Sequence, residues 1–356
     1  MKTISIIGVD LAKRVFQVHG VNKDHQVVVQ KQLSRSEVLT WFAKQEPCLV
    51  GMEACATSHY WAQEISKLGH DVKLIPPAYV KPYVRRQKND RTDAAAICEA
   101  VSRPSMRFVA IKTQEQQAVQ TLHRTRELLV QQIIQTNNAL RAHLAEFGLA
   151  FPLGNVGMSQ AKKMVEENEN ADLPAFAQQA MCCLVEQLKT LHQEVAKLDK
   201  QMVAWHKSQA DSQRLATIPG IGVVTASAIL AAIGSGKQFK SGREFAAWVG
   251  LVPRQNSSGG KERLGGISKK GNPYLRKLLV TGATCQLRGQ RPNKAAGGEW
   301  FKQLMRRKSA RVASVALANK MARVAWAVLT KGEAYKGAVM VDATKDSDMA
   351  LSVGAA

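Results

Sequence analysis

The chain has 356 residues, enough for two or three domains, and its hydrophobic content of 45% can support buried cores. Its net charge of +22 and pI near 9.9 predict a polyanionic partner: nucleic acid first, with an anionic membrane surface as the weaker alternative. No apolar run approaches the roughly 18 residues of a membrane span, and six cysteines without CxxC spacing or a preceding signal peptide predict reduced thiols, no zinc site and a cytoplasmic location.

The first hundred residues predict a small α/β domain. Residues 3–9 are β-branched and apolar, which predicts a buried strand ended by Asp10. A second apolar strand, residues 48–52, runs into Glu53 in the same way. The other expected elements are strands at 15–21, 25–33 and 71–77, the first two forming an antiparallel meander, and helices at 34–45, capped by Ser34 or Ser36, and at 58–69.

Four acids stand at the ends of these elements. Asp10 and Glu53 follow buried strands, and Asp90 and Asp93 begin a helix, three positions apart and so on one face. Taken singly, the first two could be turn acids, and the second two could complement the helix dipole. Together they could converge, and four carboxylates repel unless cations lie between them, so we expect a Mg²⁺ or Mn²⁺ site suited to phosphoryl transfer.

From Thr113 onward, helical spacing dominates. One stripe of apolar residues lies between 129 and 147. After a break near 151–157, a second stripe alternates in steps of four and three, which is typical of a heptad seam. These two segments predict a long antiparallel helix pair. The same seam could pack against another protomer, so we expect a homo-oligomer, with dimer and tetramer both open.

Residues 214–234 predict two short helices around the turn Pro219-Gly220-Ile221-Gly222. In a helix–hairpin–helix, such a turn leaves backbone amides free at a helix N-terminus, where they can hold a DNA phosphate without reading sequence. Gly220 and Gly222 are the candidate contacts. An ordinary interhelix turn is the alternative.

Residues 250–278 combine two adjacent serines, five glycines after them and many cations. The glycines make a stable strand or helix between Ser257 and Gly266 unexpected, so we predict a flexible loop that grips a phosphodiester and places Ser257 or Ser258 against phosphorus. A Gly/Ser linker is the alternative, although linkers are rarely this basic. The candidate phosphate-binding side chains here are Arg254, Lys261, Arg263, Lys269, Lys270 and Arg276.

Basic helices are expected to follow this loop. From Arg254 to Lys331 there are 18 Lys and Arg residues against Glu262 and Glu299, an excess that indicates a nucleic-acid footprint. The last stretch, from about residue 334, is small and polar and predicts a disordered tail. The densest cluster of cations consists of Arg306, Arg307, Lys308 and Arg311.

The chain resembles the DEDD recombinases of insertion sequences that are related to the Piv DNA invertase, which are bridge-RNA-guided recombinases. The resemblance covers nearly the whole length. It is carried by GVDLAK with Asp10, GMEACATSHYW with Glu53, NDRTDAAAI with Asp90 and Asp93, IPGIG at 218–222, and the run from 245 to 279. Each motif alone is modestly specific, whereas their order and spacing together are strongly specific.

The resemblance implies a fold and a mechanism. Residues 1–108 would form a RuvC-like, RNase H-type domain, 109–210 a helical coiled-coil region, and 211–333 a mostly α-helical transposase domain, with 334–356 as the tail. The four acids would bind divalent metal, and a serine, Ser258 by the family pattern or Ser257 if aligned from the other side, would form a covalent link to DNA. A structured noncoding guide RNA would set the sequence choice by base pairing, in a nucleoid-associated prokaryotic protein.

Two other functions remain open on the sequence. A structure-selective endonuclease would hydrolyse DNA with the four acids and use the serines only to bind phosphate. A non-enzymatic nucleic-acid scaffold would carry a degenerate acidic site. Nothing in the residues themselves distinguishes RNA from DNA as the partner.

Overall fold

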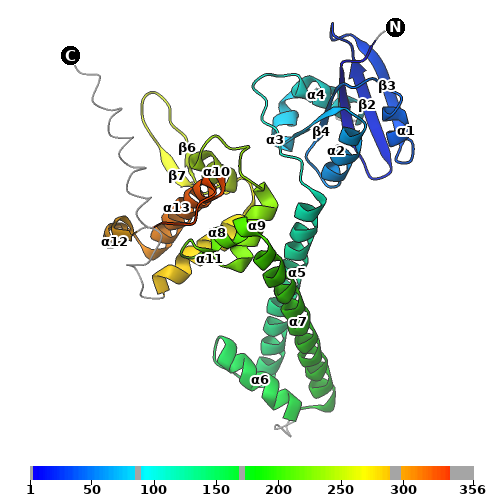
Figure 1. Cartoon of the computed structure of the whole chain (residues 1–356). Coiled ribbons are helices and arrows are strands. Elements are labelled where there is room, and N and C mark those ends of the chain that lie inside the picture. The colour runs from blue at the N-terminus through cyan, green and yellow to red at the C-terminus, as the bar shows by residue number, and fades with distance from the viewer. Residues whose placement is uncertain (1–2, 85–89, 168–172, 289–297, 337–356) are drawn as a thin grey trace, which may run out of the picture. The chain divides into compact units, whose positions relative to one another are not determined.

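The computed structural model describes residues 3–84, 90–167, 173–288 and 298–336 (Figure 1). The chain divides into two compact units, Met1–Gln117 and Ala118–Ala356, and helix α5 (Gln114–Glu146) runs across the boundary. Most of the expected C-terminal tail lies outside the described residues. The two units are described separately below.

The first unit contains a five-stranded mixed sheet with strand order β3-β2-β1-β4-β5. β1, β2 and β3 form the expected antiparallel meander, and β4 and β5 add parallel to β1. The α/β prediction for this region is therefore confirmed. The strands are β1 (Ile6–Leu11), β2 (Val15–Val21), β3 (Val27–Ser34), β4 (Leu49–Glu53) and β5 (Asp71–Ile75).

Helices cover both faces of this sheet because its strands β1 and β4 carry apolar residues on both sides. On one face, α1 (Val38–Phe42) and α2 (Ser58–Lys67) share a core with Ile7 and Val9 of β1. On the other, α4 (Asp90–Val101) lies directly against the backbone. A Cβ on Gly8 would overlap the α4 backbone, and one on Gly51 would meet Val101 at 2.8 Å. Two short helices, α3 (Pro77–Val80) and η1 (Lys81–Tyr83), precede α4.

Two local expectations in this unit are wrong. Asp10 lies inside β1, which continues to Leu11 because Asp10 and Leu11 still pair with β2. The helix expected over 34–45 with a serine cap is only five residues long, and Ser34 ends β3 instead. The Glu37 carboxylate takes the role of local acceptor, binding the Ser34 amide at 2.8 Å and its hydroxyl at 2.6 Å.

The second unit begins with long helices. α5 and α7 (Ala175–Ser208) lie side by side and antiparallel (Figure 1), with Ile133 and Leu140 of the first in one core with Leu188 and Leu191 of the second. The long helix pair is therefore present. Between them stands α6 (Asn155–Glu167), which begins within the break expected near 151–157. Its residues Met158, Ala161 and Val165 recur at helical spacing and are buried in the same core.

The rest of this unit is mainly helical, as expected, and encloses its own core. That core draws on α8 to α13 and on the turn after α8. A two-stranded sheet, β6 with β7, projects from it. The elements are α8 (Ala210–Ala216), α9 (Val223–Ile233), α10 (Gly242–Val249), β6 (Pro253–Gln255), β7 (Leu264–Ile267), α11 (Pro273–Arg288), α12 (Gly298–Arg307) and α13 (Ala310–Lys331).

Among the described residues, α13 alone is long and apolar enough to cross a membrane by length and composition. Its apolar residues form no uninterrupted run in the sequence, because Arg311, Lys320 and Arg323 lie among them. Leu317 and Met321 are fully buried and belong to the core of the second unit. The packing is therefore that of a core helix.

Candidate active site and nucleic-acid interface

Asp10 and Glu53 occupy neighbouring strands at the same edge of the sheet. β1 and β4 are parallel, with Val9 opposite Met52, so the next position on each strand is Asp10 and Glu53. Adjacent strands lie about 4.8 Å apart, and residues in register point to the same face. The nearby Cys55 thiol is influenced by both acids. Burial is the largest cause of its raised pKa, and the negative charges of Glu53 and Asp10 raise the pKa further. The structure brings these two predicted ligands together.

The face on which these carboxylates stand is the one that α4 covers. Side chains alternate along a strand, so Asp10 shares its face with Gly8, and Glu53 shares its face with Gly51. Both glycines touch α4. They are the positions at which the helix could not approach if a side chain were present, so the two glycines set the height of α4 above the two acids.

Asp93 lies in the first turn of α4, one residue before Ala94, whose carbonyl oxygen sits over Gly8. Its Oδ1 atom is buried and has no hydrogen-bond partner among the described residues. A buried carboxylate oxygen is costly without a partner, and a cation would supply one. Asp90 is exposed at the start of the same helix, beside residues 85–89, which lie outside the described residues.

The donor set suits a hard divalent cation. Asp10, Glu53 and Asp93 supply carboxylate oxygens at one edge of the sheet, and oxygen is the ligand that Mg²⁺ and Mn²⁺ prefer. In the part of the chain described, no three His, Cys, Asp or Glu side chains are close enough to share one ion as they stand. Asp10, Glu53 and Asp93 could share one ion only after side-chain rotation or a shift of the first turn of α4.

The two serines lie in a hairpin, which corrects the expectation that the glycines would prevent a strand. Gly259 and Gly260 have φ values of +57° and +72° and form the tip, where the Lys261 amide donates to the Ser258 carbonyl oxygen at 3.1 Å. Two consecutive left-handed residues define a type I′ turn, which suits the twist of a strand pair. The two tip glycines therefore favour the hairpin, because they form its turn.

The two serine hydroxyls differ in their surroundings. Ser257 Oγ accepts from Gln255 Nε2 at 3.1 Å and from the Arg263 amide at 3.2 Å. The Ser258 hydroxyl forms no hydrogen bond with a described residue, and Ser258 is exposed at the first position of the turn. Ser257 thus holds the hairpin together, whereas the Ser258 oxygen is available to a ligand.

The hairpin is basic along its length and firmly seated at its base. Arg254, Lys261, Arg263, Lys269 and Lys270 are all exposed. Below them, side chains on Gly250 and Gly271 would overlap the backbone of residues 270 and 248. Arg276 is partly committed there, because its Nη1 donates to the Val249 carbonyl oxygen at 2.9 Å and so closes the C-terminus of α10.

The two candidate glycines of the tight turn before α9, Gly220 and Gly222, have different surroundings. Gly220 has a φ of +84° and faces inward, where a Cβ would lie 2.9 Å from Met321 Cε and 3.0 Å from the Gly282 carbonyl oxygen. Gly222 is exposed and has no atom within 4 Å of its would-be Cβ. Gly220 therefore serves packing, and Gly222 opens the N-terminus of α9 to solvent.

The cation cluster Arg306, Arg307, Lys308 and Arg311 is exposed where α12 ends and α13 begins. The structure also shows a buried group that the sequence reading missed. His123 is 3% exposed, and its ring nitrogens lie 3.1 Å from the Tyr274 hydroxyl and 3.1 Å from Ser227 Oγ. Burial lowers the pKa of His123 to about 4 and raises that of Tyr274 to about 12. No local pattern marks His123, because most residues one helical turn away, Gln120, Arg126 and Glu127, are polar or charged.

Two family models match the chain. The model described as a DEDD-type transposase of IS110 covers residues 7–148 and so includes all four acids. The model described as Transposase IS116/IS110/IS902 family covers residues 212–296 and so includes the α9 turn and both serines.

Known relatives agree with both models. A probable family 20 transposase of Pseudomonas aeruginosa is 48% identical over 94% of this chain and 99% of its own length. The transposase for insertion sequence element IS1111A of Coxiella burnetii is 39% identical over 94% and 92%. A pilin gene-inverting protein of Moraxella bovis is 31% identical over 34% of this chain and 37% of its own. The chain therefore belongs to the IS110 and IS1111 transposases of insertion sequences, enzymes that cleave and rejoin DNA.

Proposed function

We propose that this transposase cuts DNA by attack of the Ser258 hydroxyl on a backbone phosphorus, which leaves a covalent phosphoserine. The Oγ–P bond forms, the bond from phosphorus to the departing strand end breaks, and the Oγ proton passes to a base. The observation that carries the proposal is the contrast between the two hydroxyls: Ser257 Oγ accepts two hydrogen bonds, whereas Ser258 Oγ has no described partner. Because the ester conserves the energy of the broken bond, the strands can be rejoined without a high-energy cofactor.

The hairpin residues position the phosphodiester for this step. Lys261 and Arg263 are exposed beside the turn, and the bare backbone of Gly259 and Gly260 allows a phosphate to approach Ser258 closely. The exposed amides at the start of α9, next to Gly222, give a second phosphate contact of the helix–hairpin–helix kind.

Asp10, Glu53 and Asp93, with Asp90 beside them, would hold Mg²⁺ or Mn²⁺. A hydroxyl is a weak nucleophile near neutral pH, and a bound divalent ion would stabilise charge that develops on phosphate oxygens. The acids belong to the first unit and the serines to the second. In this proposal they meet over one phosphate, either within one chain or between protomers of a dimer or tetramer.

The wider assignments belong to the same proposal. The mixed sheet with α4 on one face supports a RuvC-like domain over 1–108, and the packed pair α5–α7 supports a coiled-coil region within 109–210. The transposase domain spans 211–333, with a tail at 334–356. A structured guide RNA would choose the target, and a net charge of +22 suits two nucleic acids at once, in a cytoplasmic, nucleoid-associated protein.

The second candidate function is hydrolysis of DNA by the acids alone. The adjacency of Asp10 and Glu53 favours it, because a metal-dependent hydrolysis at these acids would not require a serine. A strand-exchange assay separates the two. We expect Ser258→Ala to abolish exchange with DNA binding retained, and Ser257→Ala to keep exchange. If Ser258→Ala still exchanges strands, the serine mechanism at this position is wrong, and cleavage that persists without rejoining would favour the nuclease.

A further inference from the structure

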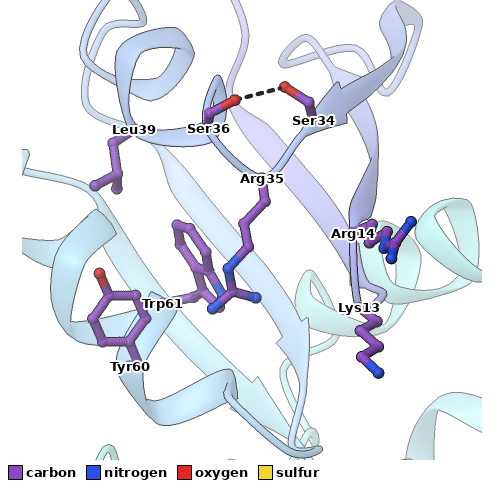
Figure 2. Close-up of a pocket in the computed structure, with 8 residues that line it drawn as sticks. All are labelled: Lys13, Arg14, Ser34, Arg35, Ser36, Leu39, Tyr60 and Trp61. Carbon is purple, nitrogen blue, oxygen red and sulfur yellow. Dashed lines mark hydrogen bonds between the residues drawn. The ribbon is translucent and has the colours of Figure 1, made fainter.

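The first unit carries a shallow pocket of about 640 Å³ that none of the roles above uses (Figure 2). Three separate segments line it. Lys13 and Arg14 come from the turn between β1 and β2, the second segment begins with Ser34 at the end of β3 and continues through Arg35 and Ser36, and Tyr60 and Trp61 belong to the first turn of α2. The volume lies within the range of small-ligand sites and is sufficient for about one nucleotide.

The floor of the pocket is aromatic. Trp61 is only 4% exposed and packs edge-on against Phe16, with ring centroids 5.0 Å apart, and against Tyr60 at 5.2 Å. The Tyr60 side chain remains 44% exposed. A rigid, buried indole thus holds an exposed phenol ring in place, which is the arrangement of a stacking platform.

A guanidinium completes the platform. The Arg35 side chain extends across the pocket (Figure 2), and its Cζ atom lies 5.1 Å from the centroid of the Trp61 ring. Guanidinium planes stack on aromatic rings and on nucleobases alike. Arg35 and Tyr60 therefore offer two exposed planar groups from different elements at one place.

The charge of the pocket is uniformly positive. Its lining includes Lys13, Arg14 and Arg35 and no acidic residue. Glu37, next to the lining residue Ser36 in the chain, accepts hydrogen bonds from the Ser34 amide and hydroxyl. Because the Ser34 hydroxyl donates to Glu37, the Ser36 hydroxyl, 3.1 Å away, donates to Ser34 Oγ and offers its own oxygen as an acceptor at the rim. Cations beside planar groups suit a ligand with both a phosphate and an aromatic base.

The position of the pocket also suits the enzyme. Lys13 and Arg14 follow Asp10 in the turn after β1, and Tyr60 follows Glu53 in the segment after β4. The pocket is therefore at the edge of the sheet where the acids lie. It is on the opposite face, because Trp61 shares its core with Ile7 and Val9 rather than with Gly8. A nucleic-acid strand that passes around this edge of the sheet would reach both the acids and the pocket.

We propose that this pocket binds one unpaired nucleotide of a single-stranded nucleic acid, with its base stacked on Tyr60 and Arg35 and its phosphates held by Lys13 and Arg14. An unpaired nucleotide is required because stacked neighbours in a duplex cover the faces of each base. DNA and RNA share this chemistry. The inference does not depend on Ser258 or on the metal site.

The test uses the full-length protein and measures affinity for a short single strand by fluorescence anisotropy. Each strand is prepared as DNA and as RNA, with a pyrimidine or with an abasic residue at its centre. Stacking of one base contributes roughly 1–3 kcal/mol, so Tyr60→Ala should weaken binding of the base-bearing strand by about 5- to 150-fold. Tyr60→Phe should bind as the unaltered protein does. Tyr79→Ala is the matched control, because Tyr79 is 43% exposed in the same unit and outside the pocket.

A second readout locates the contact directly. The central base is replaced by 5-iodouracil, the complex is irradiated, and the cross-linked peptide is identified by mass spectrometry. We expect cross-links at Tyr60 or Trp61, with the DNA and RNA arms showing which strand occupies the pocket. Three results would overturn the proposal: cross-links only elsewhere, equal affinities of Tyr60→Ala and Tyr79→Ala, or equal losses on base-bearing and abasic strands, which would indicate a phosphate site without stacking.

Discussion

The Ser257 hydroxyl accepts a hydrogen bond from the Arg263 amide at 3.2 Å, and so joins the two sides of the hairpin just below its tip. Ser257→Ala removes this acceptor, and a hydrogen bond of this kind contributes about 1 kcal/mol. We expect the Arg263 amide to exchange its hydrogen about fivefold faster in Ser257→Ala, measured by NMR. Ser258→Ala should leave that rate unchanged, because its hydroxyl holds no part of the hairpin. Equal effects of both changes would remove the structural distinction between the serines.

Gly8 is the point at which α4 rests on the sheet. Gly8→Ala would force a Cβ into the Ala94 carbonyl and the Cys98 amide, which are backbone atoms that cannot rotate away. Overpacking of this kind costs about 1–3 kcal/mol or more, so we expect a clear fall in melting temperature. Gly266→Ala is the control, since its would-be Cβ has no atom within 4 Å. A Gly8→Ala protein as stable as the Gly266→Ala protein would show that α4 does not sit this close to the acids.

Gly222 allows stability and DNA affinity to be moved in opposite directions. Gly222 is the N-cap of α9, so an aspartate there would cap the helix and complement its dipole, leaving stability unchanged or raising it by up to about 1 kcal/mol. The same carboxylate would repel a phosphate, so we expect Gly222→Asp to bind duplex DNA more weakly. Gly222→Ser caps without charge and serves as the control. If both variants bind DNA equally well at low salt, the turn makes no phosphate contact.

His123 predicts how stability changes with pH. Burial lowers its folded pKa to about 4 from the ordinary value of 6.5, so between these values the unfolded chain holds the extra proton. Stability from this group is complete above about pH 6.5 and is lost as pH falls toward 4, by roughly 2 kcal/mol at pH 5. Chemical denaturation at pH 7 and pH 5 should show this loss, and His123→Gln should show less of it. An identical pH dependence in His123→Gln would assign the effect to other groups.

The sequence predicts the helices and strands more fully than the arrangement of the candidate active site. The apolar strands before Asp10 and Glu53 were predicted because apolar β-branched runs have few other solutions, and the parallel pairing of β1 with β4 then aligns the two acids. Glycine content alone argues against the hairpin strands, whereas the tip of this hairpin requires two positive φ values, which Gly259 and Gly260 supply. The serine cap of α1 failed because Glu37 competes for Ser34.

The basic pocket could not be predicted from local pattern. Arg35 and Trp61 come together through tertiary folding of segments that are separate in the sequence. The same holds for His123 and Tyr274, whose contact joins α5 to α11. The sequence predicts Gly220 as a phosphate contact, whereas its close packing against Gly282 depends on a helix that lies far along the chain.

The most direct test of the serine mechanism is a trapping experiment. The protein is incubated with labelled element-junction DNA, Mg²⁺ and the proposed guide RNA, then denatured, and the DNA-shifted protein band is digested for mass spectrometry. The account predicts a phosphodiester adduct on Ser258, present in Ser257→Ala and absent in Ser258→Ala. Cleaved DNA without any protein-linked band, or an adduct on a different residue, would contradict it.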